Sequence, residues 1–125
     1  MENIFANKLI GFEEQYSYYK LENGLEKFDT PKEDNCHTVK FLAYGPSFQV
    51  VSNALEESTY INHITGEPFI RTSILYANIF RNAIVQIEFG EDENKQTIET
   101  KKVDLSTINY NLIKIVAKKW IKEVL

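Results

Sequence analysis

The sequence predicts an α+β fold in which a small antiparallel sheet from the N-terminal half packs with about three helices. Three stretches predict it: a tyrosine-rich region with turn residues over 15–44, an apolar stretch over 72–88, and an amphipathic segment over 106–124. At 125 residues the chain has room for one domain, 1–125. Its 43% apolar and 26% charged composition is typical of a globular protein with a core.

The first part of the chain predicts a short helix followed by a hairpin. Apolar side chains in residues 1–14 are spaced as in one or two amphipathic turns, so we expect a short helix there. Residues 15–28 predict a hairpin, because tyrosines favour strands and Asn-Gly favours a tight reversal. The tyrosines are Tyr16, Tyr18 and Tyr19, and the turn is Glu22-Asn23-Gly24.

A third strand and a helix follow the polar loop 29–35. The strand is expected over 37–44, with Val39, Phe41 and Ala43 on one face and Lys40 on the other. Gly45-Pro46-Ser47 is a helix start, since serine caps well and proline suits the first turn. We expect this helix to reach about residue 60 and to bury Phe48, Val51, Ala54 and Leu55.

The most apolar stretch predicts a central helix over 72–88. Residues 62–68 contain Gly and Pro and should break the preceding helix, so that the central helix folds back beside it. Only a narrow polar strip remains on its surface, and this strip includes Asn78. The last third also alternates in the manner of a strand. In that alternative the last third of the stretch and residues 97–103 are the two strands of a hairpin, and this hairpin forms a second small sheet.

The C-terminal segment predicts a long amphipathic helix over 106–124. The charged run 90–102 before it is expected on the surface. The inward side chains of the helix are expected to be Leu112, Ile113, Val116, Ala117, Trp120, Ile121 and Val124. Lys114, Lys118 and Lys122 lie on the solvent-facing stripe.

The charge of the chain is unevenly distributed. Residues 1–100 carry 8 basic and 16 acidic side chains, net −8, whereas residues 101–125 carry 6 basic and 2 acidic, net +4. A basic tail can contact an acidic partner through Lys114, Lys118 and Lys122, although lysines near a helix C-terminus also suit its macrodipole. The acidic remainder argues against nucleic acid as a partner.

No motif in the sequence requires a metal, a cofactor or a catalytic residue. Cys36, His37 and His63 lack zinc-site spacing, and Cys36 is expected to be a buried or idle thiol. The acidic run 91–94 lacks the glycine and glutamate of a calcium loop. An enzyme alternative comes from Asp92 with Glu99-Thr100-Lys101, which has the outline of a metal-dependent nuclease site.

Location and contact surfaces are also suggested by composition. One cysteine, with no leader pattern, predicts a cytoplasmic protein without a disulfide. No run reaches the roughly 18 apolar residues of a membrane span, so no membrane partner is expected. An aromatic hairpin with Tyr16, Tyr18 and Tyr19 suits protein contacts, since tyrosine gives contact area at low entropy cost.

Several segments in their order along the chain resemble a phage protein family. They are TVKFLAYGPSF, ITGEPF, NAIVQIEF, GEDENKQT and VDLSTINYNLIKIVAKKW, within 38–125. This part of the chain resembles small tailed-phage proteins of the tail assembly chaperone type. The resemblance implies a non-enzymatic virion-assembly protein that binds phage tail subunits or itself.

Other functions stay open beside this one. The tyrosine-rich hairpin departs from the pattern of that family and leaves room for a structural virion component or a host-directed phage inhibitor. An inhibitor or immunity-type protein that binds through its acidic face is a further alternative, because residues 1–100 carry a net charge of −8. The nuclease is the third.

Overall fold

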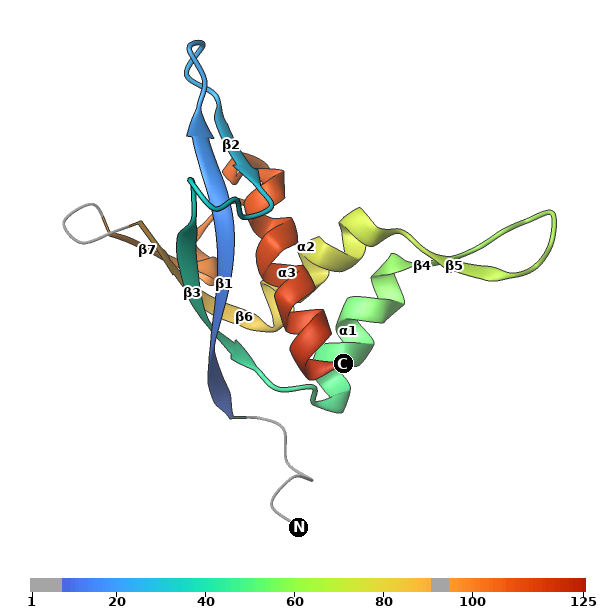
Figure 1. Ribbon diagram of the computed structural model, residues 1–125. Helices are drawn as coiled ribbons and strands as arrows, with labels where there is room; N and C mark the ends of the chain where they lie inside the picture. Colours follow the sequence, from blue (N-terminus) through green and yellow to red (C-terminus); the bar gives the residue numbers. More distant parts are fainter. Residues whose placement is uncertain (1–7, 91–94) are drawn as a thin grey trace.

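The structure, a computed structural model, describes residues 8–90 and 95–125 and confirms the α+β prediction. Within this part of the chain, a five-stranded antiparallel sheet has the order β2-β1-β3-β6-β7. Three α-helices lie on one side of it (Figure 1). The strands of the sheet are β1 (Leu9–Lys20), β2 (Glu26–Asp29), β3 (His37–Tyr44), β6 (Ile84–Phe89) and β7 (Gln96–Glu99).

The predicted tyrosine hairpin is confirmed, but the predicted N-terminal helix is wrong from Leu9 onward. β1 and β2 pair around a turn in which Gly24 has φ +87°, a conformation that glycine adopts without strain. From Leu9 onward the chain is strand, not helix, because it pairs with the whole length of β3. The backbone pairing with β3, an apolar strand of eight residues, favours strand more strongly than the weak helical spacing of the apolar residues favours helix. Residues 1–7 lie outside the described part.

The third strand matches its predicted bounds and its predicted inner face. Val39, Phe41 and Ala43 are buried on the side that the helices cover, while Lys40 points outward near Glu13. Phe12 of β1 stacks on Phe41, with 5.0 Å between ring centroids. The sheet therefore presents one apolar face to the helices and one polar face to solvent.

The helices form a second layer over the apolar face of the sheet. α3 (Tyr110–Val124) lies against β1, β2 and β3, and α2 (Thr72–Asn82) packs between α3 and α1 (Phe48–Ser58) (Figure 1). As expected, α2 folds back beside α1. The core between the layers contains Val39, Phe41, Ile79, Phe80, Ile84, Ile87, Val116, Ala117 and Trp120.

The predicted central helix 72–88 is too long, because the chain changes to strand at Ile84. α2 ends at Asn82, and β6 pairs with β3 on one side and β7 on the other. The strand alternative for the last third was the correct one. However, β6 and β7 extend the main sheet and do not form a second sheet, so the sheet is not confined to the N-terminal half.

The burial of Asn78 and Phe48 is the opposite of what helical periodicity predicted: Asn78 was expected on the surface and Phe48 in the core. Asn78 is buried, and its amide donates a hydrogen bond to the carbonyl of Ala54 at 3.4 Å, joining α2 to α1. Phe48 is 89% exposed, although it was expected in the core. It is the first residue of α1 and lines a surface hollow with Val51 and Leu55.

α1 ends at Ser58, earlier than predicted, and leads into a small hairpin. β4 (Thr59–Ile61) and β5 (Pro68–Ile70) pair across the segment predicted as a helix break. In the turn between them Gly66 has φ +74°. Figure 1 shows this hairpin extending away from the helices beyond the end of α1. We call residues 59–70 the arm.

The C-terminal helix is confirmed, with a later start than the predicted residue 106. Leu105–Thr107 is a short 3-10 turn, and Asn109 caps α3 by accepting a hydrogen bond from the amide of Asn111. Leu112, Ile113, Val116, Ala117 and Trp120 are buried as expected, and Ile121 and Val124 are half-buried. In the described residues no helix is long and apolar enough to cross a membrane.

Candidate functional site

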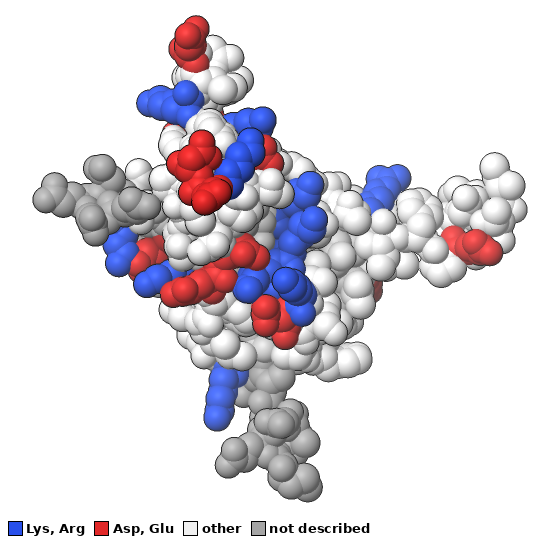
Figure 2. Space-filling model, in the orientation of Figure 1, with Lys and Arg blue, Asp and Glu red and all other residues white. Residues whose placement is uncertain are grey.

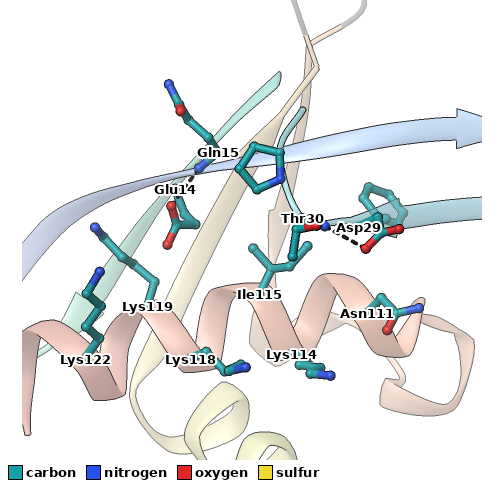
Figure 3. Close-up of a pocket in the computed structure, with 12 residues that line it drawn as sticks. Glu14, Gln15, Asp29, Thr30, Asn111, Lys114, Ile115, Lys118, Lys119 and Lys122 are labelled. Carbon is teal, nitrogen blue, oxygen red and sulfur yellow. Dashed lines mark hydrogen bonds between the residues drawn. The ribbon is translucent and has the colours of Figure 1, made fainter. Parts of the chain in front are cut away.

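The predicted lysine stripe occurs on α3, next to the side of the helix from which Ile115 and Lys119 point toward β1 and the end of β2 (Figure 3). Lys114, Lys118 and Lys122 follow one another at four-residue spacing, which places them on one face. Figure 2 shows basic side chains gathered in a column over α3, with acidic side chains next to it. The structure therefore brings the three predicted lysines together.

These lysines form one wall of a groove of about 400 Å³. The opposite wall comes from β1 and from the chain at the end of β2. Ile115 points from α3 toward Thr30, so the middle of the groove is apolar while its helical wall is basic (Figure 3). The lining residues are Glu14, Gln15, Phe28, Asp29, Thr30, Pro31, Asn111, Lys114, Ile115, Lys118, Lys119 and Lys122.

Only one of the four groove lysines has its charge balanced by a neighbour in the described part of the chain. Lys119 forms an ion pair with Glu123 at 3.0 Å, and this hydrogen bond raises the pKa of its ammonium group. In the described residues no carboxylate lies within 4.0 Å of the ammonium groups of Lys114, Lys118 and Lys122. The uncompensated charge of the groove wall is therefore positive.

Repulsion between the three lysines of the stripe destabilises α3. Like charges four residues apart destabilise a helix by about 0.2–0.5 kcal/mol per pair. The macrodipole offsets this cost for Lys122 in the last turn, but not for Lys114 near the N-terminal end of α3. An anion bound in the groove would relieve the repulsion.

Acidic groups mark the rim opposite the stripe. Asp29 accepts a hydrogen bond from the amide of Thr30 at 2.8 Å, which lowers the pKa of its carboxyl group, and the nearby charges of Lys27 and Lys32 lower it further. Lys27 lies 3.6 Å from the carboxylate. The Asp29 carboxyl group is thus ionised at neutral pH, with its charge balanced in part by Lys27.

This lowered pKa predicts a small acid-dependent loss of stability. A carboxyl group whose folded pKa lies below its unfolded value of about 3.9 stabilises the fold above that pH and loses this contribution as pH falls through the folded pKa. We expect Asp29→Asn to reduce the decline of the urea midpoint between about pH 5 and pH 2. Parallel curves for the two proteins would contradict this assignment.

The predicted tyrosines do not form an exposed contact surface. Tyr16 is buried, with its ring 5.5 Å from that of Phe28. Tyr18 is half-buried, and burial together with the nearby Glu26 carboxylate raises its pKa. Lys32 lies over the ring of Tyr19 at 5.5 Å. Their expected role as a joint contact site is therefore wrong for Tyr16, and the lining residues of the groove include none of the three.

A larger cavity lies on the other side of Phe28. It has a volume of about 860 Å³, and Tyr16, Tyr18 and His37 line it together with side chains of β6, β7 and the start of α3. Most of this lining is aromatic or aliphatic. The tyrosines thus contribute to the interior between the sheet and α3.

Glu99 and Thr100 of the nuclease alternative make structural contacts. Glu99 forms an ion pair with Lys102 at 2.9 Å, and the hydroxyl of Thr100 is buried and donates to the carbonyl of Ile84. In residues 8–90 and 95–125 no three His, Cys, Asp or Glu side chains are placed to hold a metal ion together. Asp92 lies outside the described residues, as does the acidic run 91–94. Cys36 is exposed, not buried.

The sequence predicted the basic wall of the groove, which α3 forms, but not the opposite wall, which β1 and the end of β2 form. Thr30 and Pro31 lie in the exposed loop predicted for them, whereas Asp29, predicted in the same loop, is the half-buried last residue of β2. All three lie about eighty positions before the helix that they face. No local pattern signals such a pairing. Comparisons of the chain with models of protein families, with curated proteins and with solved structures give no match.

Proposed function

We propose that this protein is a non-enzymatic binding protein that acts through protein–protein contacts, with an acidic segment of its partner in the groove between α3 and β1–β2. The observation that carries the proposal is the stripe of Lys114, Lys118 and Lys122 beside the apolar Ile115 and Pro31. Carboxylates of a bound segment would offset the lysine charges, and its apolar side chains would cover the groove centre.

Within this proposal, the protein belongs to virion assembly in tailed phages, and its partners are tail subunits. This part rests on the resemblance of residues 38–125 to proteins of the tail assembly chaperone type. It also places the protein in the host cytoplasm or in the virion. The fold itself is neutral on this point, since similar architectures serve many functions.

A labelled peptide of alternating Glu and Leu tests the groove directly. Charge reversal at Lys114, Lys118 and Lys122 to Glu is expected to weaken its binding at least about tenfold, because three favourable charge contacts become repulsive. Fluorescence anisotropy at low and high salt measures the effect, and wild-type binding should weaken as salt rises.

The matched control reverses three lysines that do not line the groove. Lys8→Glu, Lys20→Glu and Lys101→Glu together change the net charge by the same amount and are expected to leave peptide binding within about twofold. Equal losses in both triple variants would mean that general charge, not the groove, binds the peptide. Pull-down with the two variants from phage-infected cells then tests whether tail proteins depend on the groove.

A further inference from the structure

The arm is an apolar element that the rest of the chain leaves uncovered. Ile61, Ile64, Phe69 and Ile70 are all exposed, and Ile64 at the tip is 94% exposed. A two-stranded hairpin alone is marginally stable in water and gains stability by packing against a further surface. The arm makes few contacts with the described body beyond its junction with α1.

The two faces of the arm differ in chemistry. On one face Tyr60 stacks on Phe69 at 6.0 Å between centroids, and Arg71 lies over Tyr60 at 4.1 Å. Alternation places Thr59, Ile61, Pro68 and Ile70 on the other face, as their pairing confirms. This second face is aliphatic and has no charged side chain.

The aliphatic face of the arm continues into an apolar hollow on α1. Phe48, Val51 and Leu55 line the hollow, together with Ser52, Glu56 and Thr59. Because Thr59 belongs to both surfaces, they form one strip with the hollow at one end and the arm at the other. The arm cannot enter its own hollow, since β4 begins directly where α1 ends and extends away from it (Figure 1).

We infer that a second copy of this chain covers this strip in a two-fold dimer, in which each arm lies in the α1 hollow of the other copy. A two-fold axis near Thr59 exchanges the two ends of the strip, as an isologous interface requires. α1 with 11 residues is about 16 Å long, and the arm consists of the paired strands Thr59–Ile61 and Pro68–Ile70 with Ile64 in the turn between them.

The proposal accounts for the two most exposed large hydrophobic side chains. Phe48, at 89%, lies at the far end of the hollow, and Ile64, at 94%, lies at the tip of the arm. In the two-fold arrangement Ile64 of each copy meets Phe48 of the other. The arm and the hollow together supply 17 residues per copy, a small interface beside the roughly 20–30 residues that a standard one takes from each partner.

The charge of the arm is compatible with a second copy as the occupant. Glu67 is the one formally charged side chain between Thr59 and Ile70, so two chains of net charge −4 can approach through the arm with little repulsion. Arg71 lies over Tyr60 on the aromatic face and stays outside the contact, and Glu56 is the one acidic side chain that lines the hollow.

Sedimentation equilibrium of the full chain tests the dimer. Ile64→Asp and Phe48→Asp are each expected to raise the dimer dissociation constant at least about a hundredfold, because every substitution occurs twice in the interface. Leu25→Asp is the matched control: Leu25 is 61% exposed in the β1–β2 hairpin, against 62% for Ile61 in the arm, and its substitution should leave the dimer intact. Far-UV circular dichroism checks that each variant is folded.

Cysteine pairs test the arrangement itself. In a Cys36→Ser background, an equimolar mixture of Phe48→Cys and Ile64→Cys chains is expected to form a covalent dimer under mild oxidation, while either variant alone stays largely unlinked. A wild-type chain that remains monomeric up to about 1 mM would overturn the proposal. So would efficient linkage of Phe48→Cys with itself, or an equal loss of dimer in Leu25→Asp.

Discussion

Replacing Phe80 with aspartate is expected to unfold the protein. Phe80 lies on α2 and is buried between the helices and the sheet. Truncating a buried phenylalanine costs about 3–5 kcal/mol, and a carboxylate in its place adds the cost of burying an unpaired charge or protonating it. Small domains have only about 5–15 kcal/mol of stability. Far-UV circular dichroism and near-UV spectra should both lose their native features.

Phe48→Asp is the matched control for this prediction. It is the same substitution in a neighbouring helix, at a side chain that is 89% exposed. Aspartate at the first position of α1 also interacts favourably with the helix macrodipole. We expect its spectrum to remain native, with the unfolding midpoint of the monomer unchanged or slightly raised. A folded Phe80→Asp protein would contradict the assignment of α2 to the core.

Replacing Trp120 with alanine is expected to lower the free energy of unfolding by about 3–5 kcal/mol. The Trp120 indole is fully buried, and its Nε1–H donates a hydrogen bond to the carbonyl of Tyr44 at 2.8 Å. This contact joins α3 to the end of β3. The substitution therefore leaves a cavity and also removes a link between the two layers.

Trp120→Phe separates these two contributions. It keeps most of the buried area but removes the hydrogen bond, so we expect a smaller loss of about 1–3 kcal/mol. Urea titrations of both variants give the free energies. Because Trp120 is the single tryptophan of the chain, wild-type emission should be blue-shifted and move to the red on unfolding. Wild-type emission typical of a water-exposed indole would contradict its burial.

The candidate groove was half predictable from the sequence. The stripe of Lys114, Lys118 and Lys122 follows from helical spacing alone, since the residues that share a helix face are fixed by its period. The second wall at Asp29–Pro31 depends on where α3 docks. That position is set by contacts of high sequence separation, such as the hydrogen bond from the Asn109 amide to the carbonyl of Glu26.

The sequence by itself determined the elements whose local signals agree. It predicted the β1–β2 hairpin from Asn-Gly, the strand over 37–44 from its alternation and the C-terminal helix from its period, and the structure contains all three. In each case side-chain pattern and turn chemistry favour the same conformation. The α+β class follows from these elements together.

Some segments have patterns that suit both helix and strand, and only the tertiary structure decided which conformation they adopt. Residues 84–89 are apolar enough for a helix, and pairing with β3 on one side and β7 on the other makes them strand. Residues 9–14 become strand for the same reason. Phe48 and Asn78 exchange their predicted environments because burial depends on which helix lies alongside, and amphipathic spacing carries no information about where the neighbouring helix begins.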